Sequence, residues 1–473
     1  MLARPASHPR LVLGTLASCG VLMAVMQTIV VPLLPQLPAL TGSAPTDVSW
    51  LLTVTLLTGA VFTPLLGRAG DMYGKRRVLL LALGFMVAGS LLCAVSSTLA
   101  VLVVGRALQG AALAVVPLGI SILRDELPKE RVIPAIAMMS ATLGVGAALG
   151  IPLATLVVQH ADWHTMFWLC AALGVIDVIA VLMIVPESPL RTSGRFDVVG
   201  AVGLSAFLVC LLVAVSKGSA WGWGSPATLG FFAAAVVIAP LWAIHQLRAD
   251  TPLVDLRVSS RPAVLFTNLA AVLVGFSFYA NSLATAQLVQ EPVSTGYGLG
   301  ASIVVSGLCL LPGGVAMVLL SPVSARLSAA RGPRFTLALA TAIMALGYAV
   351  RLFTSENLIA IVVGATVVAA GTAVAYSALP ALIMHAVPVT ETAAANGLNT
   401  LMRSIGQAVC SAVVATVLAT VVATHQGHTA PTLDAYLVVF VIAGVCALAA
   451  LALTLLIPVK RQAGSRVLAG SAA

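Results

Sequence analysis

Long uncharged runs alternate with short polar segments along almost the whole chain. A run of about 20 residues lets an α-helix cross the hydrocarbon core of a bilayer, because each residue adds about 1.5 Å to a helix. Proline and glycine recur between the runs, as expected for loops. Fourteen runs meet this pattern, at residues 11–34, 48–67, 78–96, 99–121, 134–158, 166–186, 197–216, 226–246, 263–289, 301–322, 335–353, 357–384, 395–423 and 434–457. We therefore predict an all-α integral membrane protein with fourteen transmembrane helices.

The composition supports the same class. The sequence has 473 residues, of which 60% are hydrophobic and 8% are charged, whereas a soluble domain carries roughly 25% charged residues. The net charge of +9 does not indicate nucleic-acid binding, because the basic residues form short clusters between apolar runs. The seven cysteines lie inside apolar runs and lack the spacing of a metal site. We expect no metal, no cofactor and no nucleic acid, and a chain that contacts membrane lipid.

The basic residues also predict which helix ends face the cytoplasm. With fourteen helices and a cytoplasmic N-terminus, all but four of the 24 lysines and arginines fall in cytoplasmic loops and tails, in agreement with the positive-inside rule. The exceptions are Arg106 and Arg403 inside helices, and Lys217 and Arg351 in outer segments. Omitting one helix would invert every later loop and remove the asymmetry. We expect a multi-pass protein of the cell membrane with both termini cytoplasmic.

The loop after the second predicted helix combines glycines, an acid and a basic cluster. Its turn and charged positions are Gly67, Asp71, Gly74, Lys75, Arg76 and Arg77. From the residues alone, this is a tight turn with a basic anchor at the cytoplasmic surface. The loop also resembles the one between helices two and three of the major facilitator superfamily. That resemblance implies a charge latch between two halves of the protein, in which Asp71 and the three bases break and re-form contacts during transport.

The fourth predicted helix contains an arginine well inside the span. A charged side chain at the bilayer centre costs about 3 kcal/mol on insertion scales, so Arg106 needs a polar interior and a partner. Gln109 lies about one helical turn away. The stretch resembles the fourth-helix motif of the same superfamily, and the resemblance links Arg106 to proton transfer. The structural alternative is that Arg106 ties helices together through backbone carbonyls.

Small residues form one face of the fifth predicted helix. Gly146 and Gly150 are one turn apart, which lets a neighbouring helix approach closely, and Pro152 follows. The stretch resembles the antiporter motif of the superfamily, although Gly150-Ile-Pro152 replaces the family's Gly-Pro pair. Two interpretations stay open, a hinge that favours export and a plain packing face.

Two further stretches, 194–200 and 252–257, flank the seventh and eighth predicted helices. They resemble the linkers around the extra central helix pair in the fourteen-helix drug:proton antiporter branch of the superfamily. This resemblance implies an N-terminal six-helix bundle at 1–190, a central two-helix insertion at 191–250 and a C-terminal six-helix bundle at 251–473. The basic segment 326–334 partly repeats the first-half loop, as expected of two parallel repeats.

One position departs from that branch. Its members commonly carry an acid in the first helix, and Met26 stands there in this sequence. The deepest remaining acid is Asp177 in the sixth predicted helix, about 16 Å from the outer end of the helix. Two interpretations remain open. Asp177 carries the proton, with Arg106 as its charge partner, or it is a structural partner of a neighbouring polar group.

Polar side chains within the spans are candidates for the substrate cavity. By analogy with the family, helices one, four, nine and thirteen contribute to it. The resulting candidates are Gln27, Gln109, Tyr279, Asn281, Asn399 and Arg403. The alternative role for each is an interhelical hydrogen bond, worth about 0.6 kcal/mol.

These features together predict a proton-driven exporter of small amphipathic organic compounds, of the drug or antibiotic type, which works by alternating access as a monomer. No Gly-x-x-x-x-Gly-Lys-[Ser/Thr] loop is present, so we expect no ATP hydrolysis and no enzyme. The alternatives are a facilitator or proton symporter that imports a small metabolite, and a membrane sensor without transport. Without a first-helix acid, we expect neutral or anionic substrates to be favoured over dications.

Overall fold

The computed structural model describes residues 9–30, 33, 37–43, 45–48, 50–353, 357–425 and 428–458. Within them, thirteen helices are long and apolar enough to cross a membrane. The fifth predicted span, 134–158, lies inside α8 (Lys129–His160), a continuous helix of 32 residues that is not one of these thirteen. The all-α membrane fold is confirmed, while the number fourteen remains a prediction. Four basic residues used for the topology prediction lie outside the described residues: Arg4, Lys460, Arg461 and Arg466.

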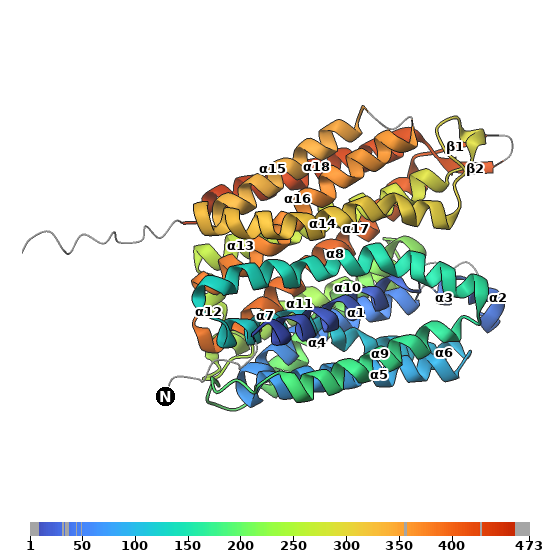
Figure 1. Cartoon of the computed structure of the whole chain (residues 1–473). Helices are drawn as coiled ribbons and strands as arrows, with labels where there is room; N and C mark the ends of the chain where they lie inside the picture. The colour runs from blue at the N-terminus through green and yellow to red at the C-terminus, as the bar shows by residue number, and fades with distance from the viewer. Residues whose placement is uncertain are drawn as a thin grey trace, which may run out of the picture.

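The first part of the chain forms one bundle of helices that lie side by side (Figure 1). A 3₁₀ turn at Ala111–Ala114 joins α6 to α7, so that the two form one span. Short helices α2 (Leu37–Thr41) and α3 (Pro45–Val48) precede the second long helix. The long helices besides α8 are α1 (Pro9–Thr28), α4 (Trp50–Tyr73), α5 (Lys75–Val95), α6 (Leu99–Gly110), α7 (Val115–Glu126) and α9 (His164–Ile184).

The last part of the chain forms a second bundle, which occupies the upper half of Figure 1. Its helices are α13 (Pro262–Gln290), α14 (Ile303–Arg331), α15 (Pro333–Arg351), α16 (Leu358–Ala386), α17 (Thr392–Thr420) and α18 (Leu433–Leu456). Short 3₁₀ turns, Val293–Thr295 and Val389–Glu391, follow α13 and precede α17. Strands β1 (Val422–His425) and β2 (His428–Pro431) pair antiparallel after α17. This hairpin was not predicted, because the sequence between the last two helices has only turn residues as a local signal.

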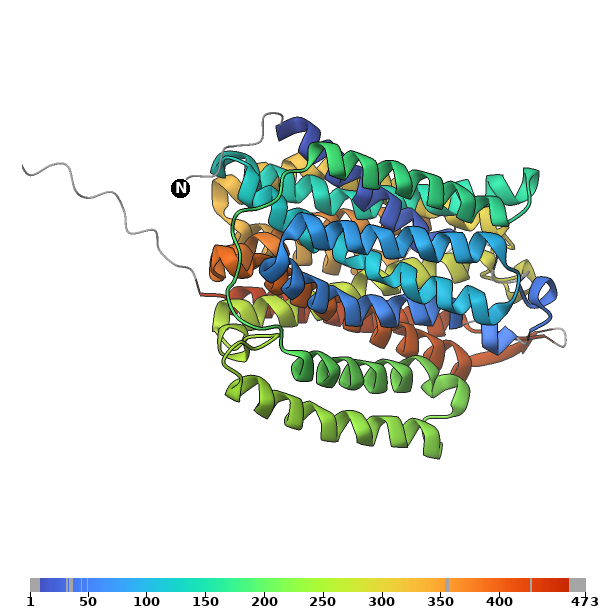
Figure 2. The same cartoon turned by 90° about the horizontal axis from the view of Figure 1, so that it is seen from below.

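Two helices lie between the bundles in the sequence and beside them in space. Figure 2 shows α10 (Val198–Trp221) and α11 (Pro226–Arg248) along one side of the molecule, followed by the short α12 (Leu256–Ser259). The side chain of Asp197 caps α10 by accepting the Gly200 N–H at 2.7 Å. Ser225 caps α11, with Pro226 in its first turn. Helix α10 packs against both α4 and α17, whereas α11 packs mainly against α10.

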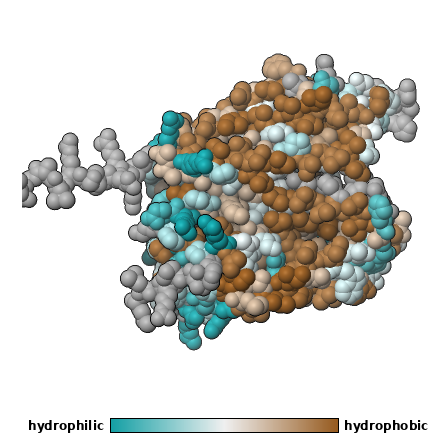
Figure 3. Space-filling model, viewed as in Figure 1, coloured by the Kyte–Doolittle hydropathy of each residue, from teal (hydrophilic) through white to brown (hydrophobic). Residues whose placement is uncertain are grey.

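The outer surface of the helices is apolar. Large side chains such as Met183, Val236 and Ile359 are 81%, 71% and 77% exposed. Figure 3 shows hydrophobic residues over the middle of the molecule and hydrophilic residues gathered at the end where α12 lies. Exposed apolar area of this extent belongs in a hydrocarbon environment rather than in water. The molecule therefore has the surface of a multi-pass membrane protein.

Buried apolar side chains form one core that lies mainly in the first bundle and two cores in the second. The first core also includes Ala381, Met384 and Ala393 of the second bundle. A further cluster joins them, because it combines residues of α4, α10 and α17: Ala60, Ala201, Leu204, Leu208, Leu212 and Leu401. The central helix α10 therefore holds α4 of the first bundle and α17 of the second through apolar packing. This arrangement covers one side of the boundary between the bundles.

Candidate functional site

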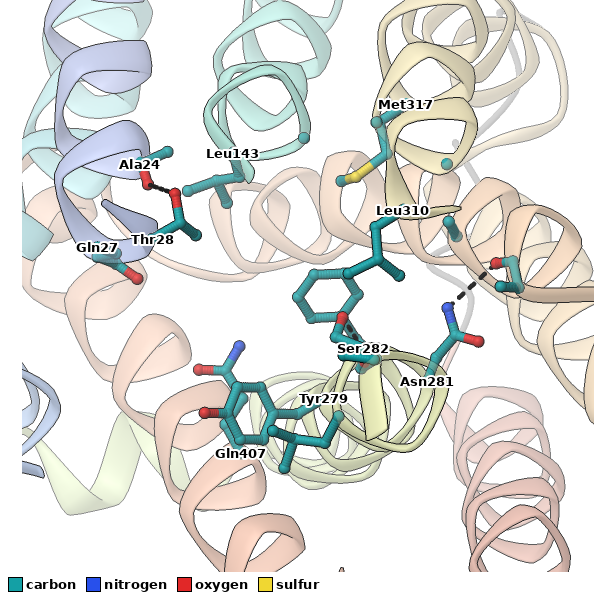
Figure 4. Close-up of a pocket in the computed structure, with 18 of the residues that line it drawn as sticks. Ala24, Gln27, Thr28, Leu143, Tyr279, Asn281, Ser282, Leu310, Met317 and Gln407 are labelled. Atoms are coloured by element: carbon teal, nitrogen blue, oxygen red, sulfur yellow. Dashed lines mark hydrogen bonds between the residues drawn. The ribbon is translucent and has the colours of Figure 1, made fainter. Parts of the chain in front are cut away.

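A cavity of about 280 Å³ lies between the two bundles. Its walls come from α1, α4, α6 and α8 on one side and from α13, α14, α16 and α17 on the other. Figure 4 shows Gln27, Tyr279 and Gln407 around the central space, with Leu143 and Met317 on the opposite side. Because both bundles contribute, any relative movement of the bundles changes the shape of the cavity.

The lining is mostly apolar, with a few amide and hydroxyl groups. Phe278 and Tyr376 meet edge to face with ring centroids 5.6 Å apart, and Tyr376 and Tyr279 both line the cavity. Arg106 is the charged residue among the lining residues that the structure describes, and no carboxylate accompanies it there. A cavity of this chemistry can bind an aromatic molecule and orient it with a small number of hydrogen bonds.

The structure places three of the predicted cavity residues in the lining: Gln27, Tyr279 and Asn281. The Asn281 amide is engaged by the protein, because Nδ2 donates to the Ala365 carbonyl at 3.1 Å and Oδ1 accepts from Arg351. The Gln27 side chain donates from Nε2 to the sulfur of Met23 at 2.9 Å. Gln27 and Tyr279 are therefore better placed than Asn281 to contact a ligand.

The other three predicted cavity residues lie outside the described lining. Gln109 is fully buried and donates to the Ser90 hydroxyl at 2.9 Å. Asn399 donates to Asn268 Oδ1 at 2.9 Å, a contact between α17 and α13. The Arg403 guanidinium lies 4.6 Å from the centre of the Tyr376 ring. Arg403 therefore supports the cavity through Tyr376 rather than lining it.

Sequence reasoning missed Tyr376 and Gln407 as lining residues. Gln407 follows Arg403 by four residues on α17, so the two share a helix face. The four-residue spacing could therefore have indicated Gln407 as a candidate for the cavity. Tyr376 had no comparable signal, because its place in the lining depends on how α16 packs against α13.

Arg106 is 1% exposed and bonded on several sides. Its Nε donates to the Leu51 carbonyl at 3.2 Å, and Nη1 donates to the Met26 carbonyl at 3.1 Å and to Gln109 Oε1 at 2.8 Å. These bonds join α6 to α4 and to α1. The geometry matches the alternative in which Arg106 ties helices through carbonyls, and Arg106 also reaches the cavity wall.

Asp177 does not pair with Arg106 in this structure. Its Oδ1 accepts the hydroxyl of Ser18 on α1 at 2.8 Å, and its Oδ2 is buried with no hydrogen-bond partner among the described residues. Asp177 is 4% exposed on α9. Both residues therefore bind α1, Asp177 through the Ser18 side chain and Arg106 through the Met26 carbonyl.

Asp71 lies at the end of α4 and is fully buried. Its carboxylate accepts the backbone N–H of Ala393 at 3.3 Å and of Ala394 at 2.8 Å. These N–H groups belong to the first turn of α17, where N–H groups lack partners inside the helix and carry the positive end of the helix dipole. Asp71 therefore joins the first bundle to the second by binding a helix N-terminus.

The three bases of the loop have different partners. Lys75 Nζ lies 3.8 Å from Asp71 Oδ1 and 2.6 Å from Asp125 Oδ2 at the end of α7. Arg76 donates its backbone N–H to Glu187 at 3.2 Å, and Arg77 Nε lies 3.7 Å from the same carboxylate. Only Lys75 is next to Asp71. Arg76 and Arg77 hold the segment after α9, which belongs to the first bundle.

Residues that were not predicted complete this contact between the bundles. Arg124 of α7 donates to the Thr392 hydroxyl and, at 2.8 Å, to the Met384 carbonyl of α16. The Thr192 hydroxyl donates to the Thr390 carbonyl at 2.8 Å. A charged run at the end of the fourth span, on the same membrane side as the Asp71 loop, was a signal for Arg124. We call Asp71, Lys75, Arg124, Asp125 and Thr392 the latch.

Two glycines fit the latch for geometric reasons. Gly74 has a φ of 117° between α4 and α5, a conformation that side chains disfavour, and a Cβ there would lie 2.6 Å from a Glu187 oxygen. A Cβ on Gly67 would lie 2.7 Å from the Ala393 carbonyl oxygen. The backbones of α4 and α17 therefore approach each other closely beside Asp71.

The predicted small-residue face of α8 packs inside the first bundle. A Cβ on Gly146 would lie 2.2 Å from the Ala24 Cβ, and one on Gly150 would lie 1.8 Å from the Thr28 hydroxyl. Both neighbours belong to α1, so the face permits close contact of α8 with α1. Pro152 lies two residues further along α8.

The cavity and the latch lie at different heights in the molecule. On α4 the cavity is lined by Leu52, Thr55 and Leu56, whereas Asp71 lies two residues before the end of the helix. The 16 residues from Thr55 to Asp71 correspond to about 24 Å of helix. The bundles are therefore closed against each other at the latch end and enclose a cavity further along.

Comparison with known proteins identifies the family. The model of the Major Facilitator Superfamily matches residues 16–197 and 265–472. The chain belongs to this superfamily. The unmatched interval 198–264 contains α10, α11 and α12. The fold agrees with the crystal structure of the human organic anion transporter MFSD10 (TETRAN), with a TM-score of 0.69 and 16% identity over 94% of this chain and 99% of that chain.

Curated relatives within the superfamily are named as resistance and export proteins. The chain is 31% identical over 317 residues to the tetracenomycin C resistance and export protein of Streptomyces glaucescens, and the aligned region covers 66% of this chain and 58% of that protein. It is 26% identical over 395 residues to the multidrug resistance protein Stp of Mycobacterium tuberculosis, and the aligned region covers 82% of this chain and 72% of that protein. The chain therefore spans less than two thirds of the length of the first of these relatives.

Proposed function

We propose that this protein exports small amphipathic organic compounds across the cell membrane and is driven by the proton gradient. The observation that carries the proposal is the cavity between two bundles that are latched together at one end only. If the termini are cytoplasmic, the latch closes the cytoplasmic side and the cavity belongs to an outward-facing state. Transport then requires the latch to open and the opposite side to close.

The proposed direction of transport is supported by the relatives rather than by the geometry. Two of them carry export or multidrug resistance in their names. The fold is equally compatible with import of a small metabolite, which remains the alternative. We also propose that the protein acts as a monomer without ATP.

The cavity chemistry favours neutral or anionic substrates. Its described lining contains Arg106 and no carboxylate, and amides such as Gln27 and Gln407 supply the other polar groups. A dication would lose its hydration without gaining an opposite charge, which is unfavourable in a low-dielectric site. We therefore expect expression of the protein to give little resistance to dicationic antiseptics. Strong resistance would contradict this part of the proposal.

We propose that α1 connects the proton site to the cavity. Asp177 holds α1 at Ser18, Arg106 holds it at Met26, and Gln27 of the same helix lines the cavity. Protonation of Asp177 removes the charge that strengthens the hydrogen bond from Ser18. The resulting change in the position of α1 would alter the cavity without direct pairing of Asp177 and Arg106.

Transport by purified protein in proteoliposomes tests the main proposal. A pH gradient is imposed, and a panel of neutral, anionic and cationic amphipathic compounds is followed. Movement of the compound against the inward proton flow supports export. Movement with the protons supports the importing alternative, and absence of movement at every gradient supports a sensor without transport.

Asp177→Asn tests the proton site. We expect gradient-driven efflux to be lost while substrate counterflow, which needs no net proton movement, continues near the wild-type rate. Asp162→Asn is the matched control, because Asp162 is an exposed carboxylate in the segment between α8 and α9. If gradient-driven efflux persists in Asp177→Asn, Asp177 is structural and the proton site lies elsewhere.

A further inference from the structure

A second pocket, of about 210 Å³, lies at the latch end of the molecule. Its walls come from α4, from α12 and the linkers on either side of the central helix pair, and from α17 with the 3₁₀ turn before it. The pocket is separate from the substrate cavity, because the two share no lining residue among those described. It therefore contacts both bundles and the central insertion at once.

The pocket contains a largely buried arginine that pairs with none of the described residues. Arg68 lines the pocket and is 7% exposed. The hydrogen bonds and ion pairs of the described residues include none made by the Arg68 side chain. A guanidinium carries five N–H donors and a permanent charge. The Arg68 nitrogens are not among the buried polar atoms that lack a partner, so they face the open space of the pocket. Arg68 thus provides a ready site for an anionic group.

Three acids share the same walls. Asp250, Asp255 and Glu391 line the pocket, and none of them forms an ion pair with a described residue. Asp255 uses Oδ1 to cap α12, where it accepts the N–H groups of Arg257 and Val258 at 2.8 and 3.0 Å. The pocket therefore combines one isolated positive charge with an excess of negative charge. A simple anion would be repelled by the acids, and a simple cation would leave Arg68 unpaired.

We propose that this pocket binds a small zwitterion that carries an acid group and an ammonium group, of the type found in phosphoethanolamine. The acid group pairs with Arg68 and the ammonium group pairs with the carboxylates. Such a molecule satisfies both charges of the site at once. Its source is either a soluble metabolite or the headgroup of a membrane lipid.

A bound zwitterion would favour the closed latch. Arg68 precedes Asp71 by three residues on α4, while Glu391, Ala394 and Leu398 bring α17 and its preceding turn to the same pocket. A ligand that contacts α4 and α17 only when they are together stabilises that state. On the transport function proposed above, the ligand would slow the cycle. The binding itself does not depend on what the protein transports.

Calorimetric titration of the full-length protein in detergent with phosphoethanolamine tests the site. We expect phosphoethanolamine to bind at least tenfold more tightly than inorganic phosphate or ethanolamine alone. Arg68→Gln should weaken the binding at least tenfold, and Glu391→Gln should weaken it severalfold. Arg195→Gln is the matched control, because Arg195 is an exposed arginine of the neighbouring linker that does not line the pocket.

Two more variants and a titration in nanodiscs complete the test. If Arg68→Gln does not fold, Arg68→Lys should bind a fewfold more weakly and Ser259→Phe, which fills the pocket, should not bind. Titration in phosphatidylglycerol nanodiscs with and without phosphatidylethanolamine identifies the source. Loss of binding in the presence of phosphatidylethanolamine supports a lipid headgroup, and unchanged binding supports a soluble ligand. Absence of binding to the wild type, equal binding to Arg68→Gln, or equal affinity for phosphate alone overturns the proposal.

Discussion

The two bundles meet along two lines of contact that differ in chemistry. Along one line, α4 meets α17, with the Asp71 carboxylate on the α17 N-terminus and α10 packed against both helices. Along the other line, α8 meets α14, and the side chain of Met317 packs where Gly144 leaves space. Figure 1 shows α8 and α14 side by side across the middle of the molecule. The polar contact found beside this second line is the Ser140 hydroxyl, which donates to the Tyr376 carbonyl at 2.8 Å.

This difference indicates how the bundles can move. Hydrogen bonds from backbone N–H groups to a carboxylate are directional, so the α4–α17 contact is either formed or broken. Close backbone approach at Gly67 has the same character, since backbone atoms cannot move aside. A methionine side chain changes rotamer easily and keeps its contacts as helices shift. The α4–α17 line therefore has the properties of a switch, and the α8–α14 line those of a contact that can slide.

The largest expected effect comes from adding one methyl group to the α4–α17 line. In Gly67→Ala the new Cβ would lie 2.7 Å from the Ala393 carbonyl oxygen, a backbone atom that cannot turn away. Overpacking costs about 1–3 kcal/mol, which corresponds to about 5- to 150-fold. We expect the transport rate in proteoliposomes to fall at least tenfold in Gly67→Ala.

Gly230→Ala controls for the change of residue type, because no atom lies within 4 Å of a Cβ at that position on α11. Equal losses in Gly67→Ala and Gly230→Ala would show that transport does not depend on the close approach of α4 and α17.

Asp71→Asn should have the next largest effect. An asparagine keeps one acceptor for the α17 N–H groups but loses the charge that interacts with the helix N-terminus, worth up to about 2 kcal/mol when partly buried. We expect transport to fall about tenfold while the yield of folded protein stays near that of the wild type. The rate and a size-exclusion profile are measured together. A wild-type rate would remove the latch role of Asp71.

A smaller effect is expected for Ser140→Ala near the sliding line. The variant removes one hydrogen bond to a backbone carbonyl, worth about 1 kcal/mol. We expect the Tm in detergent to fall by about 2 °C and the transport rate to change less than twofold. A loss of transport comparable to that of Asp71→Asn would mean that both lines act as switches.

The smallest expected effect is a change in stability at Asp197, which caps α10 of the central helix pair beside the α4–α17 line. Burial alone would raise the pKa of Asp197, but hydrogen bonds from His245, Gly200 and Gln246 outweigh it and hold the pKa below its ordinary value. Because the folded pKa is below the unfolded value of about 3.9, this contribution to stability is present above about pH 4 and is lost as the pH falls through the folded pKa.

Thermal unfolding tests whether the stability contributed by Asp197 is lost as the pH falls. Asp197→Asn should lower the Tm at pH 7, and its difference from the wild type should shrink at about pH 3.5. A difference that stays constant over this range would contradict the role of the ionised carboxylate.

The sequence allowed different parts of the site to be predicted to different degrees. The Asp71 loop was recognisable because its turn glycines, acid and bases are adjacent in the chain. The partners of Asp71 were not, since Ala393 and Ala394 lie more than 300 residues away and act through backbone N–H groups. No side chain marks such a partner. The same reason explains why the carbonyl partners of Arg106 on α1 and α4 were not identified.

By itself, the sequence determined the class of this protein and the course of the chain. Hydrophobic runs of membrane-spanning length and clustered basic residues act locally, so they can be read without knowing how the helices pack. Only the tertiary structure decided which helices meet. It put Gln27, Tyr279 and Gln407 around one cavity, gave Asp71 a helix N-terminus as its partner, and placed Arg68 in a pocket that three acids also line. These contacts depend on the relative positions of helices far apart in the chain, which no local pattern encodes.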